Sequence, residues 1–337
     1  MIDYQKIFLA FLHENKIPSN ETFLMGISGG VDSMSLLHLS QTCGLNVIAA
    51  HVNYQLRKKE SELDEKLVIE YCRANNIELF TKRVDISKNV QEAINIKKPI
   101  VAVESTLISH GLPYPENIKV ANESIKAVED NGAIAATIGI IRGKVKIGLS
   151  EEDIQILAKE KNVQKVSNHN INLSIFNKEN AATTVASTIS IASKFQIRFF
   201  ATGGIGGVHL NAENTNDVSA DLYALSENSN FVICSGAKSI LDLSKTNELL
   251  ETLGITRIGY QTNYMPGFWY EETENKVDNK FDEIHEISSF LKLNENMGNK
   301  KSILIFNKVP LEKALNKNDV EKWINNCLLY TSDAADD

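Results

Sequence analysis

The sequence predicts an α/β protein whose strands form a mainly parallel, mixed sheet. Short apolar runs, among them FLMGI, LNVIAAHV, PIVAVEST and AIAATIGII, alternate with segments of helical periodicity. Such alternation is typical of right-handed βαβ units, in which the strands lie parallel. Glycine-rich turns follow the runs FLMGI and IRFFA, and parallel sheets bind ligands at the ends of their strands. We therefore expect the functional residues to lie just after the strands.

The composition is that of a globular protein of about two domains. Hydrophobic residues make up 43% and charged residues 23% of the 337 residues, which excludes a disordered or collagen-like chain. The formal net charge of −8 argues against a general nucleic-acid-coating protein. No apolar run approaches about 18 residues, so no membrane span is expected. The four widely spaced cysteines fit neither a metal knuckle nor a disulfide framework, and we expect a cytoplasmic protein.

The elements of the first stretch follow in the order strand, helix, strand, helix, strand. We expect strands at 23–27, 45–52 and 77–86, with helices over 32–41 and 60–75 between them. The second of these helices is highly charged. This order predicts two consecutive βαβ units.

A second α/β series begins near Val90. It has a helix, a strand at 99–106, a long helix over 118–131 and a strand at 133–141, and the alternation continues past Cys234. No linker rich in Gly, Ser or Pro separates the two series. We expect one domain at 1–87 and a second at 88–326.

The first glycine turn, SGGVDS, stands between an apolar strand and an amphipathic helix. A turn in this position presents backbone N–H groups and a helix N-terminus to an anion, which predicts phosphate binding. The alternative is an ordinary βα turn in which Asp32 or Ser33 caps the helix. The residues of the predicted loop are Ser28, Gly29, Gly30, Val31, Asp32 and Ser33.

This loop resembles the signature of the PP-loop ATP pyrophosphatases. The segment HVNYQLR at 51–57, followed by Glu60, Ser61 and Asp64, is similar to tRNA(Ile)-lysidine synthetases. The resemblance implies a partial, Rossmann-like fragment that binds ATP. It covers only about residues 1–87 and lacks the family's later nucleotide, lysine and tRNA-binding segments, so we do not expect tRNA as a partner.

Several residues of the second series have side chains suited to chemistry. Glu104 ends the strand VAVE, and Lys238 follows the strand FVICSGA, where a lysine with a lowered pKa can become a nucleophile. Asp217 and Asp221 are four residues apart, so on a helical turn they would share a face and suit a divalent ion. The glycines of ATGGIGGVH fail the dinucleotide spacing because position 209 is His. Each residue taken alone fits a structural role as well.

Together these segments resemble the pseudouridine-5′-phosphate glycosidases. The segments that carry the resemblance are VAVESTLISHGLPYPEN, NAATTVASTISIAS, ATGGIGGVH, DVSADL, CSGAKSILD and IGYQTNYMPGF, in the family's order. The resemblance implies a complete α/β/α glycosidase domain that reversibly cleaves pseudouridine 5′-phosphate to uracil and ribose 5-phosphate. It further implies a divalent metal, usually Mn²⁺, and a homotrimer.

The resemblance also assigns roles to individual residues. It implies Glu104 as the proton donor, Lys238 as the nucleophile and Asp217 as the metal ligand. We hypothesise that Glu104 assists opening of the ribose ring while Lys238 captures C1′ as an imine. Substrate contacts carry over to Lys165, Val185, Ser219, Ala220, Asp221 and Asn307.

Two alternatives to a working glycosidase remain. One is an ATP-dependent ligase similar to tRNA(Ile)-lysidine synthetases, and the other is a nonfunctional fusion created by sequence assembly. Residues 327–337, CLLYTSDAADD, match the translation of a common sequencing-adapter end. We expect them to lie outside the native fold. We also expect the first 87 residues to form a partial sheet with an uncovered apolar face, which favours aggregation.

Overall fold

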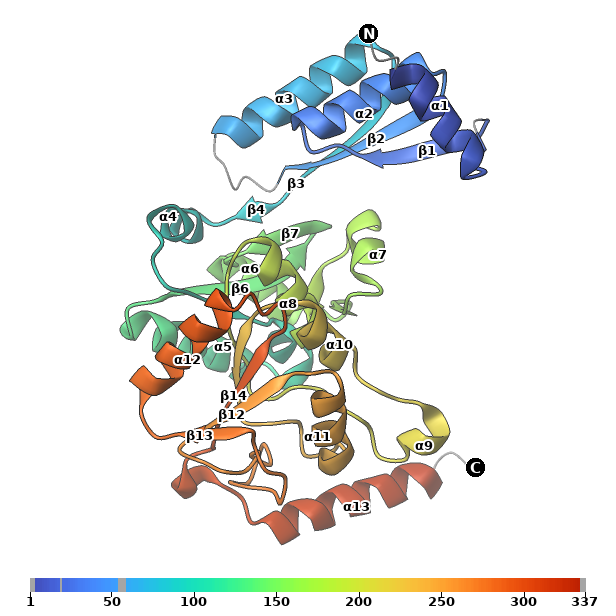
Figure 1. Ribbon diagram of the computed structural model, residues 1–337. Coiled ribbons are helices and arrows are strands. Elements are labelled where there is room, and N and C mark those ends of the chain that lie inside the picture. The colour runs from blue at the N-terminus through green and yellow to red at the C-terminus, as the bar shows by residue number, and fades with distance from the viewer. Residues whose placement is uncertain (1–3, 19, 54–58, 334–337) are drawn as a thin grey trace. The chain divides into compact units, whose positions relative to one another are not determined.

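A computed structural model describes residues 4–18, 20–53 and 59–333 (Figure 1). The chain divides into two compact units, Met1–Asp85 and Ile86–Asp337. Each unit has its own sheet, apart from the short β4 (Asp85–Ile86) at the boundary. In the described ranges, no helix is both long and apolar enough to cross a lipid bilayer.

The first unit is a three-stranded parallel sheet in the order β1-β2-β3. Its helices pack on one face through a core that includes Leu37, Val47 and Val68. On the other face Leu24 and Phe80 are 72% and 59% exposed, because no helix among the described residues of this unit packs there (Figure 1). This confirms the expected uncovered apolar face. The elements are α1 (Tyr4–Glu14), β1 (Thr22–Gly26), α2 (Val31–Thr42), β2 (Asn46–Asn53), α3 (Lys59–Ala74) and β3 (Glu78–Arg83).

The second unit is built on a larger sheet whose strand order is β13-β12-β14-β11-β10-β5-β6-β7. From β13 to β6 neighbouring strands are parallel, whereas β7 and β9 run antiparallel to β6. The predicted mixed, mainly parallel sheet is therefore confirmed. The strands are β5 (Ile100–Val103), β6 (Ile134–Ile141), β7 (Lys144–Ile147), β8 (Gln164–Val166), β9 (Ala181–Thr183), β10 (Phe199–Ala201), β11 (Phe231–Cys234), β12 (Thr256–Tyr260), β13 (Asn279–Phe281) and β14 (Ile303–Asn307).

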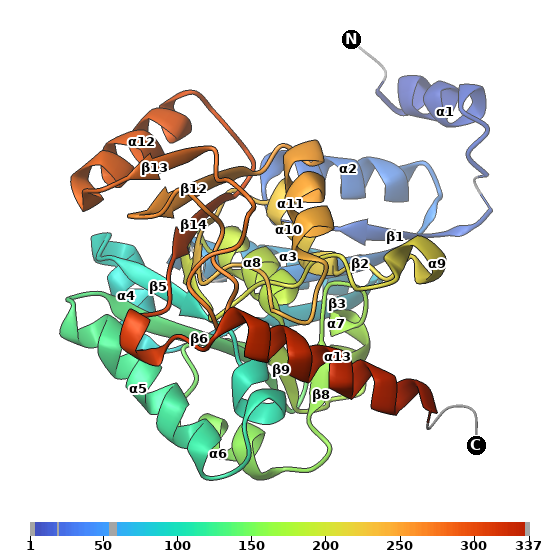
Figure 2. The ribbon, with the colours of Figure 1, turned by 90° about the horizontal axis from the view of Figure 1, so that it is seen from below.

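Helices cover both faces of this sheet. The helices of this unit are α4 (Lys88–Ile96), α5 (Glu116–Asp130), α6 (Glu151–Lys159), α7 (Ile171–Phe176), α8 (Val185–Lys194), α9 (Ala212–Thr215), α10 (Ala220–Glu227), α11 (Leu243–Thr252), α12 (Ile284–Asn296) and α13 (Lys317–Asp333), with short helical turns η1 (Leu107–Gly111) and η2 (Leu311–Lys313). Figures 1 and 2 show α5 and α12 on one face and α8, α10 and α11 on the other. This is the α/β/α arrangement that the sequence predicts.

The central helix α8 explains how the layers come together. Seven of its ten residues are buried, and its Ala, Ser and Thr side chains are small enough to pack closely on β5 and α10. Its first residue, Val185, lies at the carboxyl edge of the sheet, beside the loops that follow β5, β10 and β11. The fold thereby brings segments far apart in the sequence to one edge.

The structure corrects one expectation about local conformation. Asp217 and Asp221 do not share a helical turn, because α9 ends at Thr215 and α10 begins only at Ala220. Asp217 belongs to no helix, and the next residue, Val218, is bridged to Val208. The helix α13 continues to Asp333 and includes residues 327–333, and the expectation that residues 327–337 lie outside the native fold stays a prediction.

Candidate active site

A cavity of about 430 Å³ lies at the carboxyl edge of the second sheet. It is lined by the segments that follow β5, β8, β9, β10 and β11 and by the beginning of α10. Most of the site residues predicted from the sequence meet here. They are Glu104, Lys165, Val185, Ser219, Ala220, Asp221 and Lys238.

Glu104 lines the cavity and contacts a residue that follows the neighbouring strand, β10. Val103 of β5 lies opposite Ala201 of β10, so the next residues, Glu104 and Thr202, leave the sheet side by side. The Thr202 hydroxyl donates a short hydrogen bond to Oε1 of Glu104. Burial raises the pKa of Glu104, while Thr202 and the charge of Lys238 partly oppose this rise. A carboxyl group with a raised pKa suits proton transfer near neutral pH.

Lys238 enters the cavity from a tight turn after β11. Gly236 in this turn has φ = +91°, and a Cβ atom there would lie 2.1 Å from the carbonyl oxygen of Pro266, so only glycine fits. The backbone N–H of Lys238 donates to the Ile205 carbonyl at 3.0 Å. In the described part of the chain, no hydrogen bond or ion pair engages Nζ of Lys238. The amine is therefore available to a substrate.

Asp221 connects two of the segments that line the cavity. Its side chain accepts hydrogen bonds from the backbone N–H groups of Ala186, at 2.9 Å, and Gly206, at 2.8 Å. Asp221 is 6% exposed, so its carboxylate ties the start of α8 to the loop after β10. Asp221 also lines the cavity, and its predicted contact with substrate stays a prediction.

The predicted metal ligand, Asp217, is not part of the cavity lining. Its side chain is 62% exposed, and its Oδ2 atom lies 3.8 Å from Nδ1 of His209, which does line the cavity. Among the residues with described positions, no group of three or more His, Cys, Asp or Glu side chains could hold a metal ion. An ion that keeps most of its waters needs only one or two protein carboxylates. Asp217 therefore fits a hydrated divalent ion but not a closed protein cage.

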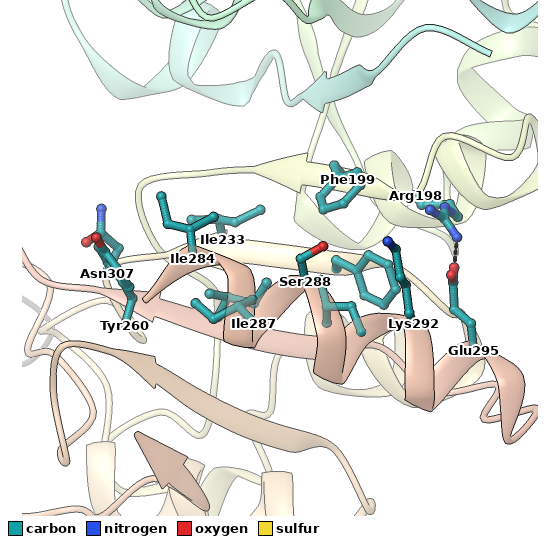
Figure 3. Close-up of a pocket in the computed structure, with 13 residues that line it drawn as sticks. Arg198, Phe199, Ile233, Tyr260, Ile284, Ile287, Ser288, Lys292, Glu295 and Asn307 are labelled. Carbon is teal, nitrogen blue, oxygen red and sulfur yellow. Dashed lines mark ion pairs between the residues drawn. The ribbon is translucent and has the colours of Figure 1, made fainter. Parts of the chain in front are cut away.

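Asn307 is not among the residues that line this cavity, and its predicted contact with substrate stays a prediction. It lines a separate apolar pocket of about 460 Å³ between α12 and the sheet, and Figure 3 shows it beside Tyr260 at one end of that pocket. Its backbone carbonyl accepts a hydrogen bond from the Ser235 hydroxyl at 3.0 Å. Asn307 ends β14, which is separated from β5 by β11 and β10, and strand order cannot be deduced from sequence position.

Three further residues of the site did not emerge from the sequence as candidates. His209 and His169 line the cavity, and Thr202 contacts Glu104 behind it. The segment ATGGIGGVH contains two of them. The only signal in the sequence for these two residues was that the segment follows an apolar strand, where parallel sheets place functional residues.

The predicted phosphate loop of the first unit has a compact geometry. The hydroxyls of Ser28 and Ser33 are 3.0 Å apart, and the Gly30 N–H donates to Oγ of Ser28 at 3.2 Å. Gly29 has φ = +89° and lies against the backbone of Asp64. The cap of α2 is Gly30, not Asp32 or Ser33. Residues 54–57 of the HVNYQLR motif lie outside the described residues.

His51, the first residue of that motif, is buried beside the loop. It is 3% exposed, and its Nδ1 atom lies 2.7 Å from the carbonyl oxygen of Ile27. Its Nε2 atom has no hydrogen-bond partner among the described residues.

The fold and the site define an α/β/α enzyme that combines a buried carboxyl group with an available lysine. The chain belongs to the indigoidine synthase A-like family, whose model matches residues 89–335, and within it to the group of the pseudouridine-5′-phosphate glycosidases. A protein of that name from Staphylococcus aureus is 46% identical over 248 residues, covering 74% of this chain and 81% of the relative. One from Brachyspira hyodysenteriae is 44% identical over 251 residues, covering 74% and 80%.

Two solved structures are similar to the second unit. An indigoidine synthase A-like protein from Thermotoga maritima is 32% identical, with a TM-score of 0.66, and 72% of this chain and 80% of that chain are covered. The prealnumycin C-glycosynthase AlnA, solved in complex with ribulose 5-phosphate, is 32% identical with a TM-score of 0.70, and the shares are 75% and 82%. A PP-loop domain model matches residues 3–99.

Proposed function

We propose that this chain cleaves the C–C glycosidic bond of pseudouridine 5′-phosphate, giving uracil and ribose 5-phosphate. The main observation behind this proposal is that Glu104 and Lys238 line the same cavity. Its support is the 42–46% identity to glycosidases of this name. The structural relative solved with ribulose 5-phosphate bound is consistent with a pentose phosphate as ligand.

The proposed chemistry follows from the bond to be broken. Pseudouridine joins ribose C1′ to uracil C5, so protonation of a leaving oxygen or nitrogen, as in ordinary glycosidases, does not help. Glu104 donates a proton to the ring oxygen O4′ as the C1′–O4′ bond breaks, and neutral Lys238 forms a C–N bond to C1′. The new secondary ammonium then loses a proton to the Glu104 carboxylate, which restores the nitrogen lone pair. This lone pair forms an iminium as the C1′–C5 bond breaks, and the electron pair of that bond stays on C5, which takes the proton from Glu104. Water hydrolyses the iminium and restores the lysine.

The phosphate of the substrate would lie toward Lys165. This side chain is on β8 at the mouth of the cavity, where Thr184 and Val185 start α8 and Ser219 and Ala220 start α10. Two helix N-termini and one ammonium group favour an anion at this place. Binding energy from the phosphate would then help to hold C1′ near Lys238, and Lys165→Ala should lower kcat as well as raise KM.

We further propose that Asp217 holds a hydrated Mn²⁺ or similar divalent ion. When bound, such an ion supplies positive charge to oxygen atoms of the substrate. Electron paramagnetic resonance of added Mn²⁺ should show binding to the unmodified protein and weaker binding to Asp217→Asn. Equal binding by both proteins would contradict the assignment.

Borohydride trapping tests the role of Lys238 directly. Reduction during turnover should leave a covalent pentose phosphate adduct whose site is found by peptide mass spectrometry. Lys238→Ala should lose the adduct, while Lys194→Ala, a change at an exposed lysine outside the cavity lining, should keep it. An adduct of equal yield on Lys238→Ala would refute the lysine mechanism. Since every step is reversible, the same site should also form pseudouridine 5′-phosphate from uracil and ribose 5-phosphate.

A second activity, ATP binding by the first unit, is favoured by its loop. Ser28, Gly29 and Gly30 lie between the end of β1 and the start of α2, where backbone N–H groups can hold phosphates. ATP binding measured by calorimetry should be lost in Gly29→Val, because a Cβ atom there would lie 2.6 Å from Cβ of Asp64. Equal binding by Gly29→Val would contradict this loop as the site.

A further inference from the structure

Thr202 lies beside Glu104 and donates a hydrogen bond to its carboxyl group. Both residues directly follow paired strands, and the parallel register places them side by side across 98 residues of sequence. The backbone N–H of Thr202 donates to the Ile233 carbonyl of β11 at 3.0 Å, which fixes the threonine between two strands. Its hydroxyl donates to Oε1 of Glu104.

The two oxygens of Glu104 have different surroundings. Oε1 is engaged by Thr202, whereas in the described ranges no hydrogen bond reaches Oε2. Glu104 lines the cavity, so Oε2 is the oxygen left for a substrate. The charged groups that act on this carboxyl group are Lys238 after β11, Asp221 on α10 and Lys165 on β8.

We propose that Thr202 is a positioning residue of the glycosidase site: its hydroxyl anchors one oxygen of Glu104 so that the other oxygen faces the substrate. This inference rests on the proposed function. It assigns Thr202 no contact with the reacting atoms. A donor to the carboxylate also favours the ionised form, so removal of the hydroxyl should raise the pKa of Glu104 above its already raised value.

Three substitutions separate this role from simple packing. Thr202→Val replaces the hydroxyl with a methyl group of similar size, Thr202→Ala removes it without adding bulk, and Thr202→Ser keeps it. With pseudouridine 5′-phosphate, Thr202→Val and Thr202→Ala should lose about ten- to a hundredfold in kcat, because the acid is no longer held in place. Thr202→Ser should stay within about threefold of the unmodified protein.

The pH profile gives the second readout. Glu104 acts as the acid, so the rate falls on the alkaline side as it loses its proton, and this limb should move to higher pH in Thr202→Val and Thr202→Ala but not in Thr202→Ser. A titration of the Glu104 carboxyl carbon by NMR, assigned through its loss in Glu104→Gln, should show the same order of pKa values without any substrate.

The outcomes distinguish the two proposals. Uracil release by the unmodified protein, together with an unchanged pH profile and an unchanged NMR titration in Thr202→Val and Thr202→Ala, would overturn the role of Thr202 and leave the proposed function standing. No uracil release by the unmodified protein would refute the proposed function. In that case the NMR titration alone would test the hydrogen bond: a raised pKa of Glu104 in Thr202→Val and Thr202→Ala would support it, and an unchanged pKa would overturn it.

Discussion

Gly206 should not tolerate even the smallest side chain. It lies in the loop after β10, and its backbone N–H donates to the buried carboxylate of Asp221 at 2.8 Å. A Cβ atom at position 206 would lie 2.2 Å from Oγ of Ser219 and 2.8 Å from Oδ2 of Asp221. The loop would have to move by about 1 Å to restore an ordinary contact, and the hydrogen bond to Asp221 would break.

The cost of Gly206→Ala follows from these two effects. Overpacking costs about 1–3 kcal/mol, and losing a hydrogen bond to a charged, buried acceptor costs about 1.5–3 kcal/mol. We expect the free energy of unfolding of the second unit to fall by about 2.5–6 kcal/mol. Urea unfolding followed by tryptophan fluorescence measures this unit alone, because both tryptophans, Trp269 and Trp323, belong to it.

Gly203→Ala is the matched control in the same loop. Its Cβ atom would make only an ordinary contact, 3.5 Å from Cε2 of Phe268, so the change in unfolding free energy should stay within about 0.5 kcal/mol. Equal unfolding free energies for Gly206→Ala and Gly203→Ala would refute the reasoning that the Asp221 contact requires a glycine.

Three further predictions concern stability, thiol reactivity and solubility. Burial would raise the pKa of Asp153, but hydrogen bonds from Lys146 and Ser150 outweigh the effect of burial and lower the pKa. The ionised carboxylate therefore stabilises the fold at pH values above the ordinary aspartate pKa. This contribution to stability is lost as the pH falls through the native pKa. Chemical denaturation of Asp153→Asn should therefore show a loss of about 1–3 kcal/mol at pH 7 that shrinks in acid; a loss independent of pH would contradict this. Burial raises the pKa of Cys234 to about 12, so iodoacetamide at mildly alkaline pH should label exposed Cys327 and spare Cys234 until the protein unfolds. Comparable labelling of the two native thiols, measured by mass spectrometry, would contradict the burial of Cys234. Replacing Leu24 and Phe80 with lysine should reduce light scattering of the chain on storage without lowering its unfolding free energy, since both side chains are exposed; undiminished scattering would show that this face does not drive association.

Local patterns in the sequence were enough to predict most elements near their observed positions. The run AIAATIGII became β6, and the periodic segment after Pro115 became α5. The antiparallel strands β7 and β9 were not predicted, because their few residues take their conformation from pairing with β6. Tertiary pairing also overrode the helical spacing of Asp217 and Asp221, since Val218 bridges to Val208 and Ser219 caps α10.

The site shows the same difference between what local sequence predicts and what strand pairing decides. Resemblance to a family identified Glu104 and Lys238, and the structure brings both to one cavity. It could not identify Thr202, because this contact depends on which strands are neighbours in the sheet. Asn307 ends β14, two positions away from β10 in the sheet, and does not line the cavity, so its contact with substrate stays a prediction.

The central claim is that Lys238 carries out glycosidic cleavage, and uracil release from pseudouridine 5′-phosphate tests it most directly. With Mn²⁺ present, the unmodified chain should release uracil, Lys194→Ala should match it, and Lys238→Ala should lose activity by on the order of a thousandfold or more. No uracil release by the unmodified chain, or comparable release by Lys238→Ala, would contradict the account.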